Sequence, residues 1–598
     1  MSRPRSILQT FSLIAVLWLF LAAPTLALPV TVQWLEAPSR ARFSVYGEVV
    51  FELLEPTPQE AERIRKQLET GSEFKVTASG SDALIWVSGQ QLGSISPGQA
   101  NRWNTTPYSL AATFVERLRK ASQGAPALRF EPDGLIVPLD EGREAVVVGA
   151  PGPAPEVSNS NPGAASVEFD GKRVRLKGLA AGDGRVRLDW GSRTLELPFK
   201  VRPWAGRLPQ TVKLRLTGRL EPAVFREALE RELLNGLYPG AKLSVAVPAK
   251  LEGGSFELAA SAEGPGLLPV SGKLKVNLDV QEFNLAEAQA LALSNRPEKI
   301  LSTGWLFDRA LPTGPTRVLY HHRNDPGGPE RYLELLVENL DAKPNRFHTV
   351  MASYGPSPDE IHVGHTATLR FVERVLSDEG QMLSLEAGQT RLVDRLRMKP
   401  GQTVSGMAYL TPLDGAKLRL KLRVVSETEE FIDDYAPTPA NSRTARGLYA
   451  PSLSQNYSHL LGGRYTYITL GDTPFLEDPE TGEASPGNFG AVYRLQLALY
   501  NPADEVREAW LEFVPGGGPA RGVVLVDNRL LDVAMGNSRT RIPLARWELE
   551  PGERRYVNIE TIPQSGSNYP VRLVVQSQFE SREDLEVEAQ AAPPPLIP

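Results

Sequence analysis

Five histidines stand close together in the sequence, and they are the residues whose type and spacing could do chemistry. The chain has 598 residues but only six histidines. Zinc and similar divalent metals bind neutral imidazole nitrogens, and a catalytic zinc commonly has three protein ligands and one water. The cluster therefore raises the hypothesis of a divalent metal site. Its candidate ligands are His321, His322, His348, His362 and His365.

The spacing limits which of these histidines can share one metal. His321 and His322 are adjacent, so on a strand their side chains point to opposite faces. The segment that holds His362 and His365 is predicted to be extended with a bend at Gly364, and residues three apart on a strand also point apart. At most one histidine of each pair would then join the same site.

The full hypothetical set combines one histidine of each pair with His348, and Asp325 or Asp359 would add a carboxylate. The H-E-x-x-H signature of zinc proteases is absent from the sequence. The alternative, which we favour, is that the histidines hydrogen-bond loops at the edge of a β-sandwich. We predict no catalytic or cofactor-binding residue, and a divalent metal is the one cofactor that the sequence suggests.

Three other features have both a chemical and a plain interpretation. The acidic segment 472–485 suggests calcium, but it lacks the EF-hand spacing and is predicted to be a solvated hairpin loop. The glycine-rich segment 514–522 lacks the Lys-Ser/Thr end of a phosphate loop and is predicted to be a turn. Tryptophans on one face would form a sugar-binding platform, but core packing is the expectation for most of Trp34, Trp86, Trp103, Trp190, Trp204 and Trp305.

The first 27 residues predict an export signal. Arg3 and Arg5 precede an apolar run at 11–23, and the small residues Thr25 and Ala27 suit a signal peptidase. The run is shorter than the roughly 20 residues that span a bilayer as a helix. We therefore expect an exported protein, whether periplasmic, secreted or on the cell surface, with no transmembrane segment in the mature chain. An uncleaved membrane anchor is the alternative.

Composition narrows the class of protein further. The chain has no cysteine, which excludes disulfides, thiolate metal sites and a lipid-attachment cysteine. Its net charge is −6 with the charges interspersed, which argues against nucleic acid as a partner. With 51 glycines and 50 prolines, it has the composition of a β-rich, turn-rich protein. The expected partners are envelope proteins or a cell-wall polymer.

The hydrophobic pattern predicts a mainly β, multidomain chain. Thr57 and Glu60 form the capping box of one helix, and 221–238 has the periodicity of another. The segment 417–425 alternates strictly, as a strand with one face on a core does. The predicted order is a signal peptide (1–27), an α+β domain (28–125), an immunoglobulin-like β-sandwich (128–203), a small α+β domain (204–284), an antiparallel β-sandwich (290–430), a linker (431–455), a related β-sandwich (456–580) and a mobile tail (581–598).

The C-terminal half repeats several sequence landmarks, which predicts an internal duplication. Asn339 and Asn501 are separated by 162 residues and lie in similar segments. Three further pairs are separated by 151 residues, and a loop insertion would explain the difference. They are Pro400-Gly401 with Pro551-Gly552, Pro412 with Pro563, and Gly415 with Gly566.

Residues 128–203 resemble the bacterial immunoglobulin-like (group 2) modules of surface adhesins and pilus-secretion proteins. Asp170-Gly171 is a strong hairpin signal between two alternating segments. The residues that carry the resemblance are Ser160-Asn161-Pro162, Ala165-Ser166-Val167, Gly178-Leu179 and Ala181-Gly182. The resemblance implies a β-sandwich that serves as a spacer or binding platform.

Residues 290–578 resemble a family of exported, mainly cyanobacterial proteins of unknown function. The likeness rests on LSNRPEKI (293–300), YHHRN (320–324), VENLDA (337–342) and GNFGAVYRLQLALYNPAD (487–504). It implies export and a β-rich fold, and it assigns no chemistry.

Together these patterns favour an exported, non-enzymatic scaffold or binding protein of the cell envelope or surface, acting through β-sandwich modules. A metal-dependent exported enzyme centred on residues 321–365 is the first alternative. A carbohydrate-binding protein of the cell wall is the second.

Overall fold

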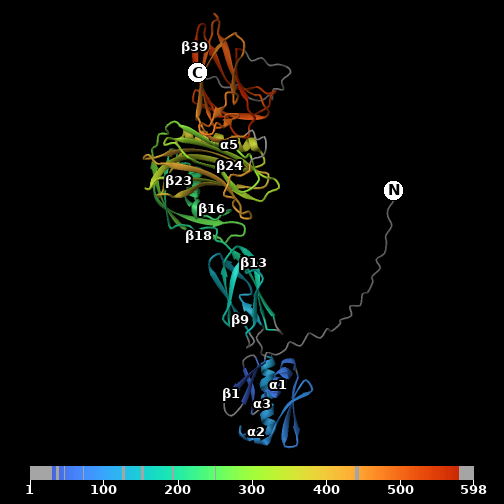
Figure 1. The fold of residues 1–598 in the computed structure, drawn as a ribbon. Coiled ribbons are helices and arrows are strands. Elements are labelled where there is room, and N and C mark those ends of the chain that lie inside the picture. The colour runs from blue at the N-terminus through green and yellow to red at the C-terminus, as the bar shows by residue number, and fades with distance from the viewer. Residues whose placement is uncertain are drawn as a thin grey trace, which may run out of the picture. The chain divides into compact units, whose positions relative to one another are not determined.

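The computed structural model describes residues 30–35, 40–45, 48–54, 56–71, 73–123, 128–149, 154–190, 194–248, 251–437 and 444–577. The chain divides into two compact units at Trp204/Ala205 (Figure 1). The fold is mainly β and multidomain, as the sequence predicts. The predicted signal peptide and tail lie outside the described residues. None of the helices within the described ranges is long and apolar enough to cross a membrane.

The first unit begins with an α+β domain of two three-stranded antiparallel sheets and three helices around one core. Thr57 caps the first helix, because its hydroxyl accepts a hydrogen bond from the backbone N–H of Glu60 (3.1 Å). Ser88 and Gly89 form the predicted hairpin turn, both with positive φ. The elements are β1 (Val30–Leu35), β2 (Arg40–Val45), β3 (Glu48–Leu54), α1 (Pro58–Thr70), β4 (Phe74–Ser79), β5 (Asp82–Val87), β6 (Gln90–Ile95), α2 (Pro97–Asn101) and α3 (Pro107–Gln123).

An immunoglobulin-like sandwich completes the first unit. One sheet has the order β7-β9-β12-β11 and the other β8-β14-β13-β10, which is the ABED and GFC arrangement with a first strand split between the sheets. Asp170 forms the predicted hairpin turn and accepts hydrogen bonds from the backbone N–H groups of Lys172 and Arg173. The strands are β7 (Arg129–Glu131), β8 (Leu135–Pro138), β9 (Gly142–Val148), β10 (Glu156–Asn159), β11 (Ala165–Phe169), β12 (Arg173–Gly178), β13 (Gly182–Asp189) and β14 (Thr194–Arg202).

The second unit contains one long sheet that crosses a predicted domain boundary. The α+β segment contributes β15, β16, β17 and β18, with helix α4 packed on them, and β15 pairs with β25 of the first predicted sandwich. The segments 204–284 and 290–430 are therefore joined by a continuous ladder of backbone hydrogen bonds. The elements are β15 (Thr211–Thr217), α4 (Pro222–Leu233), β16 (Lys242–Val245), β17 (Gly254–Glu263) and β18 (Val270–Gln281).

The first C-terminal sandwich, called copy 1 here, packs the sheet β21-β28-β23-β26 on the remaining strands of the long sheet, β25-β24-β27-β22-β19-β29. The linker prediction is wrong in part, because Arg446–Tyr449 forms β29 and pairs with β19. The elements are β19 (Ala290–Ser294), β20 (Lys299–Ile300), β21 (Gly304–Ala310), β22 (Thr316–Asn324), β23 (Arg331–Asn339), β24 (Asn345–Ser357), α5 (Glu360–Leu376), β25 (Gly380–Leu385), β26 (Thr390–Met398), β27 (Thr403–Pro412), β28 (Leu418–Val425) and β29 (Arg446–Tyr449).

The second sandwich, called copy 2, consists of the sheets β30-β34-β39-β36-β37 and β31-β40-β35-β38 around its own core. Its strand order β31-β40-β35-β38 matches β22-β27-β24-β25 of copy 1. The elements are β30 (Ser452–Leu460), β31 (Thr466–Leu470), β32 (Leu476–Glu477), β33 (Ala484–Ser485), β34 (Val492–Tyr500), β35 (Arg507–Pro515), β36 (Ala520–Val526), β37 (Arg529–Gly536), β38 (Ile542–Leu549), β39 (Arg554–Thr561) and β40 (Val571–Gln576).

One asparagine corner shows that copy 1 and copy 2 are related. At the end of β23, the amide of buried Asn339 donates to the carbonyl oxygens of Lys343 (2.8 Å) and Glu386 (3.0 Å). Its own Oδ1 accepts from the backbone N–H of Asp341 (3.0 Å). The side chain thus ties the turn after β23 to the turn between β25 and β26.

Copy 2 repeats these three bonds of the corner. The amide of buried Asn501 donates to the carbonyl oxygens of Glu505 (2.7 Å) and Glu550 (3.2 Å). Its Oδ1 accepts from the backbone N–H of Ala503 (3.1 Å). The predicted duplication and its asparagine landmark are confirmed.

The landmarks separated by 151 residues are in the wrong register. The turn at Pro551-Gly552 corresponds to Ala387-Gly388, and both glycines have positive φ. Asn345 pairs with Leu385 in copy 1 as Arg507 pairs with Leu549 in copy 2, so equivalent residues here differ by 162 and 164. The Pro-Gly match misled because the turn requires the glycine alone.

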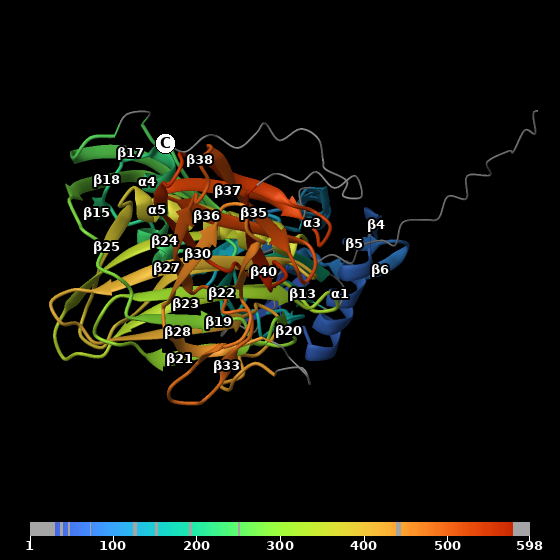
Figure 2. The same ribbon diagram turned by 90° about the horizontal axis from the view of Figure 1, so that it is seen from above.

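The two copies differ most in one connection. Copy 1 has helix α5 between β24 and β25, and copy 2 has the hairpin β36–β37 at the equivalent place, between β35 and β38. The two insertions face each other, since α5 packs against β36 (Figure 2). Their apolar side chains share a cluster with residues from both sandwiches.

The alternation predicted for 417–425 is confirmed. Leu418, Leu420, Leu422 and Val424 are buried in the core of copy 1. The opposite face carries ion pairs, because Arg423 on β28 pairs with Glu334 on β23 (2.7 Å). The wet face of the strand is therefore held by charge pairs across neighbouring strands.

Candidate functional site

The prediction of an extended segment around His362 and His365 is wrong, because these residues lie in α5. Asp359 caps the helix by accepting from the backbone N–H of His362 (2.9 Å), and Val363, Ala367 and Phe371 recur at helical spacing on the buried face. The β-branched residues and Gly364 obscured this period. The acidic cap followed by Glu360 was the signal that would have revealed the helix.

His321 and His322 lie on β22 and point to opposite sides of the sheet, as predicted for neighbours on a strand. The ring of His322 contacts Ser294 Oγ (3.1 Å) and the carbonyl oxygen of Pro297 (2.7 Å). Burial lowers the pKa of His321 to about 3 and that of His322 to about 4. Both rings are therefore neutral at physiological pH.

The other three histidines each form hydrogen bonds with a different part of the second unit. His348 bonds to Thr217 Oγ1 (2.8 Å), which joins β24 to β15. His362 bonds to the hydroxyl of Tyr354 (3.2 Å). His365 reaches across to copy 2, where its ring contacts Gln564 Oε1 (3.1 Å) and Asp532 Oδ1 (2.8 Å).

These positions bear directly on the hypothetical metal site. Within the described ranges, no three histidine, aspartate or glutamate side chains gather in a way that would hold a metal ion. The bonds of His322, His348, His362 and His365 instead join separate strands, loops and sandwiches. The metal site stays a prediction from sequence, and metal analysis of the purified protein is its test.

Of the other sequence features, the turn at 514–522 is confirmed as the connection between β35 and β36. The acidic loop is not simply solvated, because Asp478 is fully buried and accepts from the backbone N–H groups of Leu448 (2.8 Å) and Glu480 (2.9 Å). Core packing is wrong for most of the six tryptophans: Trp34, Trp103 and Trp204 are exposed, and Trp86, Trp190 and Trp305 are half-buried.

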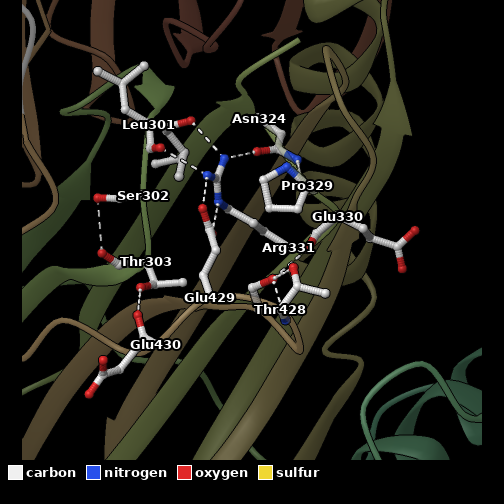
Figure 3. A network of polar contacts seen from close by, with 12 residues as sticks. Leu301, Ser302, Thr303, Asn324, Pro329, Glu330, Arg331, Thr428, Glu429 and Glu430 are labelled. Atoms are coloured by element: carbon white, nitrogen blue, oxygen red, sulfur yellow. Dashed lines mark hydrogen bonds and ion pairs between the residues drawn. The ribbon is translucent and has the colours of Figure 1, made fainter. Parts of the chain in front are cut away.

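Arg331 illustrates how copy 1 satisfies a buried charge (Figure 3). Its side chain is 1% exposed and forms a two-pronged ion pair with Glu429, at 2.7 Å for both bonds. The remaining N–H groups donate to Asn324 Oδ1 (2.7 Å) and to the carbonyl oxygens of Ile300 (3.3 Å) and Leu301 (2.9 Å). All five guanidinium donors have an acceptor, so this network is a structural tie.

Arg317, the second residue of β22, is also buried, but not all of its donors have an acceptor within the described residues. It opposes Tyr409 on β27 and lies on the face of β22 that turns away from the interior of copy 1. Its Nη1 donates to the carbonyl oxygens of Pro451 (2.8 Å) and Gly490 (3.3 Å). Its Nε has no hydrogen-bond partner among the described residues, and no ion pair between them includes Arg317.

A cavity of about 210 Å³ lies beside this guanidinium, between copy 1 and copy 2. Copy 1 contributes Arg317, Tyr409 and the last turns of α5, and copy 2 contributes residues of β34, β36 and β39. Apolar walls and one buried cation are the usual elements of a small-molecule site. The apolar lining residues are Leu285, Phe371, Val372, Val375, Leu376, Val492, Val523, Leu525 and Ile562.

Charged side chains at the edge of the cavity are paired with each other. Arg494 forms an ion pair with Glu287 (3.1 Å) and a longer one with Glu560 (3.8 Å). Burial lowers the pKa of Arg317 to about 10, so the group is cationic at neutral pH despite its surroundings. A buried cation that lacks a carboxylate partner favours an anionic ligand.

The sequence pattern does not reveal the role of Arg317, although this residue lies near the start of the strand that carries the paired histidines. The available signal was an arginine in a segment that is otherwise apolar and β-branched, 316–320. The face of the strand that it occupies depends on the packing of copy 2, which the sequence pattern does not encode.

Comparisons with known proteins give no family for the chain. No protein-family model and no curated protein matches it. Among solved structures, titin Ig tandem domains A164-A165 match 26% of this chain and 96% of that chain at 10% identity, with a TM-score of 0.12. Domains 5-6 of the S-layer protein SbsC match 25% of this chain and 97% of theirs at 9% identity, with a TM-score of 0.12.

The insect immune protein hemolin matches 35% of this chain and 62% of that chain at 9% identity, with a TM-score of 0.16. At such TM-scores these likenesses carry no argument about function. The immunoglobulin-like module of this chain is defined by its own strand order.

Proposed function

We propose that the chain is an exported, non-enzymatic scaffold or binding protein of the cell envelope or surface. The observation that supports this most is the use made of the reactive residues. His365 links copy 1 to copy 2, and Arg331 and Glu429 hold loops of copy 1 together. Histidine, arginine and glutamate side chains, which are common in catalytic sites, here hold the modules together.

The proposed partner is an envelope protein or a cell-wall polymer, and the first unit offers a surface for it. Trp103, in the connection between α2 and α3, and Tyr108, in the first turn of α3, are five residues apart and are 49% and 53% exposed. Exposed tryptophan and tyrosine are enriched where proteins bind partners. The immunoglobulin-like sandwich, which resembles group 2 modules, would act as the spacer.

Cell fractionation tests export first. The full chain should be found outside the cytoplasm and shortened by about 27 residues, as its signal sequence predicts, and a version without residues 1–27 should stay in the cytoplasm. Finding the full, unshortened chain in the cytoplasm would refute the proposal.

Binding is tested separately by sedimenting the purified chain with isolated cell walls. The Trp103→Ala/Tyr108→Ala variant should lose most of the binding, since truncating aromatic anchors removes most of an interface's affinity. Tyr556→Ala is the matched control, because Tyr556 is equally exposed (58%) but lies in copy 2. Equal sedimentation of both variants would remove this surface from the proposal.

A further inference from the structure

The cavity beside Arg317 has an unused chemical capacity that the scaffold proposal does not explain. The arginine side chain is 6% exposed, and its Nε is unpartnered within the described part of the chain. The contrast with Arg331 is direct, because both arginines are buried in copy 1 and only Arg331 has every donor satisfied. A guanidinium with free donors beside an apolar space is arranged to receive an acceptor.

We propose that this cavity binds a small monocarboxylate with an apolar body, and that Arg317 pairs with the carboxylate. The terminal Nη2 of Arg317 has no acceptor within the described residues, and a carboxylate in the cavity would supply one, since guanidinium donors match its geometry. The inference rests on the cavity alone, so it holds whether or not the chain is exported.

The walls of the cavity determine the chemistry and the size of the part of the ligand that lies beyond the carboxylate. Phe371 and Val372 on α5 and Val523 on β36 are buried apolar side chains that line the space, so they favour a hydrocarbon body over a sugar or a nucleotide. At about 30 Å³ for each group of the size of a water molecule, 210 Å³ has room for roughly seven such groups. This is the size of a six-carbon acid.

Charged residues at the edge of the cavity limit the net charge of the ligand. Glu287 and Glu560 would repel an anion, but both are exposed (77% and 50%) and share Arg494, so solvent and that arginine screen their charges. A dianion such as inorganic phosphate would meet the same acids with twice the charge and no apolar contact. The ligand is therefore a monoanion.

The probe is hexanoate, titrated into the full chain up to about 10 mM because so small a ligand binds weakly. Ligand-observed NMR should show saturable binding at one site. We expect 1-hexanol, which has the same body without the charge, to bind at least about tenfold more weakly, since a buried cation is left unpaired. Inorganic phosphate should not displace hexanoate.

Three variants separate a specific site from incidental binding. Arg317→Gln should weaken hexanoate at least about tenfold by removing the charge-assisted pair. Val375→Phe should do the same by filling the cavity while leaving Arg317 in place. Glu560→Gln should instead strengthen binding about two- to threefold, because an exposed repelling charge is removed.

No hexanoate binding to the wild-type chain overturns the proposal, as does equal binding to Arg317→Gln or equal binding of 1-hexanol. If circular dichroism shows that Arg317→Gln does not fold, the opposite effects of Val375→Phe and Glu560→Gln decide the question. Dodecanoate, tested in parallel, identifies the source of the acid. Tighter binding of dodecanoate with the same dependence on Arg317 would support the carboxylate pair with Arg317, overturn the six-carbon limit and indicate a lipid-derived ligand. None of these results depends on the fractionation experiment.

Discussion

Replacing Gly364 with alanine should destabilise the second unit, although the residue lies inside a helix. Helix propensity alone predicts the reverse, because alanine is about 1 kcal/mol more favourable than glycine in a helix interior. The structure predicts a clash, since an added Cβ would lie 1.7 Å from the carbonyl oxygen of Ser565 in copy 2. The sign of the change in unfolding free energy therefore separates the two explanations.

The magnitude follows from the contact. An ordinary contact begins at 3.4 Å, so α5 and the loop at 565–566 must move apart by about 1.7 Å. Both sides are backbone, and Gly566 also lies close to the helix, because a Cβ added to it would be 2.2 Å from the carbonyl oxygen of Glu360. Overpacking of this kind costs about 3 kcal/mol at the upper end of its usual range. Subtracting the helix gain leaves a net loss of about 2 kcal/mol.

Urea unfolding of the full chain gives the free energy, and hydrogen exchange gives the location of the change. In the Gly364→Ala variant, amide protection should fall in α5 and in the connection between β39 and β40. Gly272→Ala is the matched control, because its Cβ would meet no atom within 4 Å on β18, and its effect should stay within about 0.5 kcal/mol. A Gly364→Ala variant as stable as the wild type would refute the close packing of α5 on copy 2.

Four further results are expected. Asn501→Ala should lower the unfolding free energy by about 3 kcal/mol, since it strands several buried carbonyl groups; an effect below 1 kcal/mol in urea unfolding would contradict the corner's role. Arg331→Met should lower the unfolding free energy by about 3–5 kcal/mol, because it leaves Glu429 unpaired. Arg317→Met should lower it by about 1 kcal/mol or less, and an equal loss in the two variants would show that Arg317 is also structural. Burial lowers the pKa of His322 to about 4 in the fold, against 6.5 when unfolded, so the folded chain favours the neutral ring. The unfolding free energy should therefore be highest above pH 6.5 and fall by on the order of 3 kcal/mol toward pH 4. A flat profile of the unfolding free energy in that range would be inconsistent with the burial of His322. Mass spectrometry of purified, untagged protein should find no stoichiometric zinc, copper or iron, and one equivalent that the histidine variants lose would restore the metal hypothesis.

The features that the sequence predicts correctly are local or periodic. The alternation of 417–425 and the hairpin at Asp170-Gly171 follow from side-chain period and turn chemistry, which neighbouring residues decide. The duplication was visible because Asn339 and Asn501 bond to their own turns in the same way. The hairpin bonds of Asp170 and the bonds of Asn339 and Asn501 to their own turns join residues close in sequence, and these are the ones that a sequence pattern can reveal.

The features that the sequence does not predict depend on distant contacts. Helix α5 was obscured by β-branched residues, and its stability comes from the face it buries against both sandwiches. From the sequence, Arg317 cannot be distinguished from a surface arginine. In the structure it is buried beneath the backbone of Pro451 and Gly490, whose carbonyl oxygens accept its hydrogen bonds. Five histidines within one stretch of chain raise the hypothesis of a shared site, yet three of them lie on β22 and β24, where neighbours point to opposite faces, and two lie on α5.

The insertions α5 and β36–β37 occupy equivalent places in two copies of one ancestral sandwich, and they meet each other. An ancestor with a single sandwich had no second insertion for this connection to meet, and so no cavity between the two. The cavity beside Arg317 is then younger than the fold that encloses it. Relatives that carry one sandwich should therefore lack the cavity, whatever else they share with this chain.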